Sequence, residues 1–125
     1  MAPMLDPSSG VSAAQFSLSE EQVAVRDMAQ AFAAEVFAPH ALAWDEAKHF
    51  PIAEMRKAAE LGMGGVYISA DVGGSALSRL DATLIFEALA TGCPTVAAYM
   101  SIHNMAAWMI DAYGSNAQRN KWLPK

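Results

Sequence analysis

The sequence contains a single cysteine, Cys93, and it has few basic residues. One cysteine cannot form an intrachain disulfide, so we expect a reducing compartment. Lysine and arginine together number 8 against 13 acidic residues, which gives a formal net charge of −5. This balance argues against broad electrostatic attraction to nucleic acid or to anionic lipid. We therefore expect neither of these as a partner.

The N-terminus lacks a basic region followed by an apolar stretch. Residues 1–15 read MAPMLDPSSGVSAAQ, without the pattern of a secretory signal and without the arginines of an organellar transit peptide. We expect these residues to form a disordered leader, and we expect the folded domain to comprise residues 16–125. The location predicted from these features is the cytoplasm, in a bacterial-like setting.

Charged side chains make up only 17% of the chain, whereas apolar residues make up 54%. Ordinary soluble domains have about 25% charged and about 45–50% apolar residues. A chain of 125 residues is long enough for one hydrophobic core. The apolar surplus therefore predicts large surfaces that another domain or subunit covers.

Helix start and stop signals predict an all-α fold with about six helices and no convincing strand. Three serines precede a polar residue by three positions, which is the spacing of a capping box: Ser19 with Gln22, Ser78 with Asp81, and Ser115 with Gln118. Shorter helices are expected within 40–49 and 51–62, and Pro94 begins a helix that runs to about Tyr113. Along the first helix, apolar residues at helical spacing mark the expected core face: Val23, Met28, Ala31, Phe32 and Val36.

A glycine-rich segment at 62–78 separates the third and fourth of these helices. Its start, GMGGVY, lacks the third glycine of the dinucleotide-binding pattern, and it follows a helix where that pattern follows a strand. We therefore favour a connecting turn over a phosphate-binding loop.

The longest run without a charged residue, 88–110, allows three interpretations. A membrane span is disfavoured, because TGCP at 91–94 breaks the run and leaves only 17 uncharged residues in the second helix. A catalytic cluster is disfavoured, because His103 has no serine or cysteine three or four residues away and Asn104 projects about 100° from it. What remains is a helix buried on all sides, with His103 as a satisfied core histidine. His40 and His49 do not have metal-ligand spacing, so we expect no metal site.

One side of this helix carries small residues on consecutive turns. These are Ala97, Ala98 and Ser101, and Met105 continues the same side. Small residues in a row leave a groove on a helix surface. Two uses of this groove stay open: close approach of another helix, or room for an apolar ligand with Met105 as an adaptable floor.

Three segments carry motifs in a recognisable order: FSLSEEQVAVRDMAQAFAAEVFAP at 16–39, FPIAEMRKAAELGMGGVYISADVGGSALSRLDATLIFEALATG at 50–92, and YGSNAQRNKWLPK at 113–125. Together they resemble the N-terminal helical domain of the acyl-CoA dehydrogenase family, and they cover nearly all of the chain. Within the family, FEALATGCPTVAAYMSIHNMAAWMID at 86–111 is most similar to members that act on isobutyryl-CoA in valine breakdown.

The resemblance implies a flavoprotein with three domains, in which FAD lies between the later domains and a neighbouring subunit of a tetramer. A glutamate of the C-terminal domain removes the α-proton of an acyl-CoA, FAD takes the β-hydride, and electron-transfer flavoprotein accepts the electrons. The middle β and C-terminal α domains are absent from residues 1–125, so no catalytic or cofactor-binding residue is expected here. Carried over by position, the residues that line the acyl pocket are Ala97, Ala98, Ser101 and Met105.

The expected function is therefore to supply one wall of the acyl pocket in the α,β-dehydrogenation of a short branched acyl-CoA. A first alternative is another short-chain member of the family, acting on 2-methylbutyryl- or butyryl-CoA. A second alternative, if the chain ends at residue 125, is a non-catalytic helical interaction module.

Overall fold

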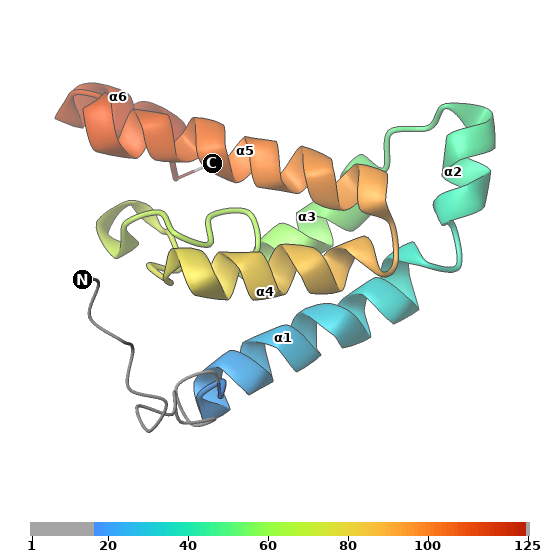
Figure 1. Ribbon diagram of the computed structural model, residues 1–125. Coiled ribbons are helices and arrows are strands. Elements are labelled where there is room, and N and C mark those ends of the chain that lie inside the picture. Colours follow the sequence, from blue (N-terminus) through green and yellow to red (C-terminus); the bar gives the residue numbers. More distant parts are fainter. Residues whose placement is uncertain (1–16, 125) are drawn as a thin grey trace, which may run out of the picture.

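Six α-helices follow one another in the computed structural model, which describes residues 17–124 (Figure 1). They are α1 (Glu20–Phe32), α2 (Ala41–Ala47), α3 (Ile52–Glu60), α4 (Arg79–Ala90), α5 (Pro94–Tyr113) and α6 (Asn116–Trp122). A π-helical turn, η2 (Ala33–Phe37), directly follows α1, and a short 3-10 helix, η3 (Ala70–Val72), lies between α3 and α4. Residues 17–124 contain no strand, so the predicted all-α fold is confirmed. The predicted leader, residues 1–15, lies outside the described residues.

All three predicted capping boxes are present, at the starts of α1, α4 and α6. In each box the serine hydroxyl accepts a hydrogen bond from the backbone N–H three residues later, and the side chain of that later residue accepts one from the serine N–H. Each pair satisfies backbone groups that a helix leaves unpaired at its start. These three boundaries are therefore encoded locally in the sequence.

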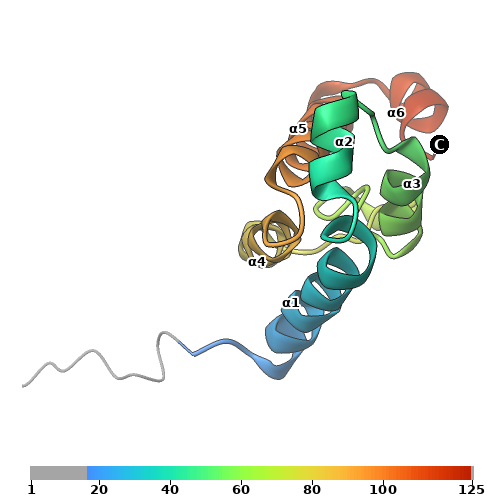
Figure 2. The ribbon, with the colours of Figure 1, turned by 90° about the vertical axis from the view of Figure 1, so that its right-hand side faces the viewer.

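Helix α4 lies between α1 and α5 and packs against both (Figure 1 and Figure 2). The buried residues of these three helices, together with those of η2, of α3 and of the segment after α3, form one core. Its members are Ala29, Phe32, Ala33, Phe37, Ala58, Met63, Val66, Ala82, Ile85, Ala88, Leu89, Cys93, Val96, Ala97 and Met100. The thiol of Cys93 is thus placed within the core.

The core face at the end of α1 differs from the predicted one. Phe32 is buried as expected, but Met28 and Ala31 are exposed, and Phe37 is fully buried. Phe37 is buried because a π-helical turn follows α1, in which the N–H of Ala38 donates to the carbonyl of the residue five positions earlier. This wider turn brings Phe37 back to the face of Phe32, with their ring centroids 5.2 Å apart.

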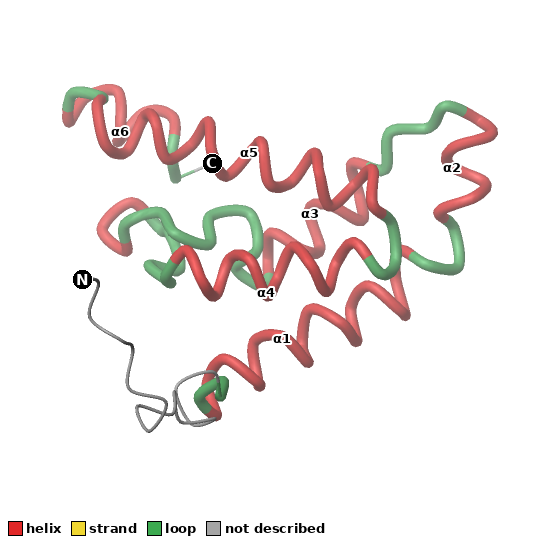
Figure 3. The backbone as a smooth tube through the Cα atoms, viewed as in Figure 1, coloured by secondary structure: helices red, strands yellow, loops and turns green. Residues whose placement is uncertain are grey.

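The glycine-rich segment connects α3 to α4, as predicted, and runs beside α5 as a long loop (Figure 3). It folds back on itself through three backbone hydrogen bonds, from Ser75 to Gly65, from Ala76 to Ile68 and from Leu77 to Val66. Gly62 ends α3 with a φ of 88°, a left-handed conformation that glycine adopts without strain. The loop is therefore an ordered part of the domain.

Candidate functional site

Helix α5 has a packed side and an exposed apolar side. On the packed side, Val96, Ala97 and Met100 lie in the core. On the other side, four large side chains are 46–59% exposed: Tyr99, Ile102, Met105 and Met109. The prediction that this helix is buried on all sides is wrong for residues 17–124, because no element of this part of the chain covers that second side. Within the same residues, no helix is long and apolar enough to cross a membrane.

The four predicted pocket residues of α5 have different environments. Ala97 is only 3% exposed and belongs to the core. Ala98 and Met105 are exposed, and Ser101 is half-buried between the two sides. The hydroxyl of Ser101 donates to the carbonyl of Ala98 at 2.7 Å, so it is engaged within its own helix. Ala98, Ser101 and Met105 are thus accessible from outside this domain, whereas Ala97 packs inward.

Asn104 is the only fully buried polar side chain among the described residues. Its Oδ1 accepts from the N–H of Val66 at 2.7 Å, and its Nδ2 donates to the carbonyls of Met63 and Met100 at 3.0 and 2.9 Å. Because both amide hydrogens are engaged with backbone, this side chain has no donor left for a substrate. The interpretation that the polar residues of α5 serve packing and hydrogen bonding is confirmed for Asn104.

His103, predicted to be a core histidine, is exposed. Asn104 occupies the buried position on this turn, and an adjacent helical residue must project about 100° away. His103 therefore lines a groove between α3 and α5, together with Ala59 and Tyr99. The His-Asn pair does not form a shared site.

A second polar cluster joins α5, α6 and the loop. The Asp111 side chain is 8% exposed and accepts from the N–H and the hydroxyl of Ser69, at 2.9 and 2.7 Å. It also accepts from the guanidinium of Arg119 at 2.7 Å, which in turn contacts Asp71 at 3.0 Å. Partial burial raises the pKa of Asp111, but the hydrogen bonds from Ser69 and Arg119 outweigh this effect, so the pKa lies below its ordinary value.

The lowered pKa predicts how acid affects the cluster around Asp111. A carboxylate with a lowered folded-state pKa stabilises the fold above its unfolded pKa of about 3.9, and this contribution is lost as the pH falls through the lower folded value. Asp111→Asn should cost about 1–3 kcal/mol at neutral pH, because it removes charged hydrogen-bond partners. It should also flatten the loss of stability below about pH 4.

Thermal unfolding of the Asp111→Asn chain, followed by circular dichroism at several pH values, measures both effects. Asp45→Asn, on the exposed surface of α2, is the matched control. Parallel pH profiles for Asp111→Asn and the unsubstituted chain in acid would contradict the prediction.

One stacked group was not anticipated from the sequence. The guanidinium of Arg79, at the start of α4, lies 3.7 Å from the ring centroid of Tyr67 and 4.7 Å from that of Trp108. These three residues come from α4, the loop and α5, so no local pattern could have associated them. The stack is a further contact between α5 and the rest of the domain, in addition to the hydrogen bonds of Asn104 and Asp111.

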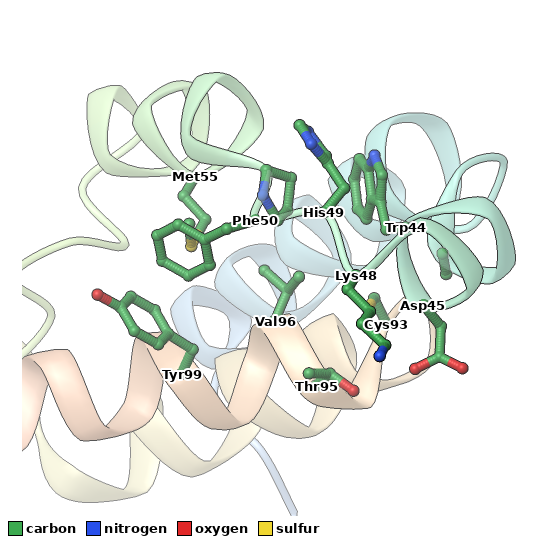
Figure 4. Close-up of a pocket in the computed structure, with 12 residues that line it drawn as sticks. Trp44, Asp45, Lys48, His49, Phe50, Met55, Cys93, Thr95, Val96 and Tyr99 are labelled. Carbon is green, nitrogen blue, oxygen red and sulfur yellow. The ribbon is translucent and has the colours of Figure 1, made fainter.

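Among the clefts formed by residues 17–124, four that border α5 contain none of the predicted pocket residues in their lining. The cleft in Figure 4 lies between α2, the start of α3 and the first turns of α5, and has a volume of about 290 Å³. Inside it Phe50 faces Tyr99, with ring centroids 4.7 Å apart, and Lys48 also lines the cleft. In residues 17–124, no three His, Cys, Asp or Glu side chains gather as metal ligands would.

Comparison with known proteins places this helical arrangement in a family. The family model for the N-terminal domain of acyl-CoA dehydrogenases matches residues 19–125. The chain belongs to the acyl-CoA dehydrogenase family. The order of motifs at 16–39, 50–92 and 113–125 had predicted this membership, which is thereby confirmed.

Several relatives resemble this acyl-CoA dehydrogenase domain. Mitochondrial isobutyryl-CoA dehydrogenase of Bos taurus is 54% identical over 120 residues, which cover 96% of this chain and 27% of that protein. The protein of the same name from Dictyostelium discoideum is 52% identical over 107 residues, covering 86% of this chain and 26% of the relative. The short-chain-specific acyl-CoA dehydrogenase of Clostridium acetobutylicum is 32% identical over 109 residues, covering 86% of this chain and 29% of the relative. The predicted similarity to isobutyryl-CoA dehydrogenases is confirmed.

The acyl-CoA dehydrogenase domain spans about a quarter of the length of the first two relatives. Both carry the description mitochondrial, which does not fit the predicted bacterial-like setting. Among solved structures, a chain from work on the electron transferring flavoprotein of Acidaminococcus fermentans matches with a TM-score of 0.80 and 29% identity. That match covers 87% of this chain and 29% of the other one.

Proposed function

We propose that this domain supplies one wall of the acyl pocket in an enzyme that carries out α,β-dehydrogenation of a short branched acyl-CoA such as isobutyryl-CoA. The observation that carries the proposal is the 54% identity with bovine isobutyryl-CoA dehydrogenase, against 32% with the short-chain-specific enzyme of Clostridium. The exposed side of α5 supports it. The small side chains of Ala98 and Ser101 leave room beside α5 for a branched acyl group. The flexible side chain of Met105 can pack against the end of that group.

The proposed cofactor, FAD, is assigned to domains outside this chain. Four of the five glycines of the loop do not fit its phosphates, because the N–H groups of Gly62, Gly65, Gly73 and Gly74 all donate to carbonyls of α3 or of the loop itself. These groups therefore cannot cradle a pyrophosphate, as an open glycine-rich turn does. The role proposed for this chain is to shape and desolvate the acyl site.

The proposed assembly is a homotetramer that passes electrons to electron-transfer flavoprotein. The exposed apolar residues support extensive partner surfaces, since Ile102, Met109 and Tyr113 on α5 are 53–81% exposed. Apolar area of this kind marks a surface that another domain or subunit covers.

A chimera tests the function directly. Residues 17–125 replace the matching segment of bovine isobutyryl-CoA dehydrogenase, and the purified protein is assayed with isobutyryl-, 2-methylbutyryl- and butyryl-CoA. The proposal predicts that the chimera binds FAD and keeps the highest kcat/KM for isobutyryl-CoA. A preference for butyryl- or 2-methylbutyryl-CoA would favour the other short-chain interpretation. A folded chimera that binds FAD but oxidises none of the three would favour a helical interaction module.

A further inference from the structure

Two side chains of α5 hold the loop between α3 and α4 against the helix. Asn104 bonds to the backbone of Met63 and Val66, and Asp111 bonds to the N–H and hydroxyl of Ser69. The two residues are seven positions apart, and seven residues of an α-helix return to within about 20° of the same direction. The loop is therefore attached to one face of α5 at two points about two turns apart.

The hydrogen bonds from Asn104 to the loop restrict the rotation of α5 about its own axis, together with those of Asp111. The apolar contacts on the packed side, made by Val96, Ala97 and Met100, carry little directional information. Hydrogen bonds depend on both distance and angle, and this fully buried amide makes two of them to the loop, with the Val66 N–H at 2.7 Å and with the Met63 carbonyl at 3.0 Å. Rotation of the helix would leave a buried N–H or carbonyl group unpaired.

The exposed residues of the predicted pocket wall lie on neighbouring turns. Ser101 projects about 60° and Met105 about 100° from Asn104 around the helix axis. Side-chain tips lie about 5–6 Å from that axis, so a rotation of about 20° moves them by about 2 Å. This is about the size of one methyl group, and a difference of one methylene in an apolar pocket changes kcat/KM by about 10-fold or more.

We propose that Asn104 is a positioning residue that sets the selectivity between branched and straight short acyl groups. It acts by fixing the rotation of α5, and thereby the directions of Ala98, Ser101 and Met105. The inference rests on the proposed function, because it takes this side of α5 as the acyl-pocket wall. Asn104 itself is fully buried and does not contact substrate.

The test is Asn104→Ala in the chimera, with isobutyryl-CoA and butyryl-CoA as substrates. We expect the ratio of their kcat/KM values to fall by about 10-fold, mainly through a higher KM for isobutyryl-CoA, while the FAD spectrum stays unchanged. Asn104→Ser, which can still donate to the Met100 carbonyl, is the milder second variant in case the alanine variant does not fold. Its ratio should fall in the same direction.

Phe37→Leu is the matched control, because it removes buried contacts of the core without removing a side-chain hydrogen bond. An unchanged ratio in both Asn104 variants, or an equal change in Phe37→Leu, would overturn the inference. If the unsubstituted chimera oxidises no acyl-CoA, the proposed function fails. Crystal structures of the unsubstituted and variant chimeras then decide separately whether α5 has rotated, and an unrotated α5 rejects the role of Asn104.

Discussion

Ala98→Leu in the chimera should lower kcat/KM for isobutyryl-CoA by about 100-fold or more. The substitution adds three carbons to an exposed position of α5, where the proposed acyl group would lie. One methylene in an apolar pocket is worth about 10-fold to 200-fold in discrimination, and a leucine here exceeds that change in size. Steady-state kinetics with isobutyryl-CoA measure the loss, and the visible FAD spectrum shows whether the flavin site is intact.

The control for Ala98→Leu is Ala43→Leu, the same change at an exposed position of α2. It should leave both kinetic constants within about twofold, since α2 carries none of the predicted pocket residues. Unchanged constants for isobutyryl-CoA in Ala98→Leu would remove Ala98 from the acyl pocket. Loss of bound FAD would instead show that this surface of α5 contacts another domain.

Gly74→Ala should destabilise the domain by about 3 kcal/mol or more, because a Cβ at this position would overlap the backbone carbonyl of Ile68. That carbonyl cannot move freely, since it accepts the N–H of Ala76 at 2.9 Å. For a domain of this size the cost corresponds to a fall in Tm of about 10 °C or more. Thermal unfolding of the 125-residue chain measures it.

Gly65→Ala provides the comparison within the same loop. A Cβ on Gly65 would meet its nearest neighbour, a side-chain atom of Ile68, at 3.5 Å, which is an ordinary van der Waals contact. We expect a change within about 1 kcal/mol. Similar Tm values for the two variants would show that the loop opens at little cost, and they would argue against its role as the fixed support of α5.

The helix boundaries could be predicted because their causes lie within a few residues. The hydroxyls of Ser19, Ser78 and Ser115 each bond to a backbone group three positions away, so the sequence contains both partners side by side. The pocket residues were predicted in a different way, through the resemblance of α5 to a family, and their role stays a prediction. Spacing alone left the groove of Ala97 and Ala98 open to a helix or to a ligand.

The polar contacts of α5 could not be predicted because their partners are distant in sequence. Asn104 bonds to Val66 and Met63, which are 38 and 41 residues away. The periodicity of α5 suggested that His103 was the buried polar residue. Asn104 is buried instead, because the loop places backbone N–H and carbonyl groups where the amide of Asn104 can bond to them. The path of the loop between α3 and α4 therefore determines which polar side chain of α5 is buried. That path cannot be predicted from the residues of α5 alone.

The π-helical turn after α1 determines where the fold can tolerate the deletion of one residue. It places Phe32 and Phe37 on one face although they are five residues apart, a spacing that would separate them by about 140° in a regular α-helix. Deletion of the exposed Ala34 or Glu35 would leave them four apart, and a regular α-helix would then keep both rings in the core. A one-residue deletion between Ala82 and Ile85 in α4 would leave these two buried residues two positions apart, about 160° from each other around the helix axis. Gaps of one residue between related sequences are thus expected after α1, where the fold can absorb them, and not within the helices that carry the core.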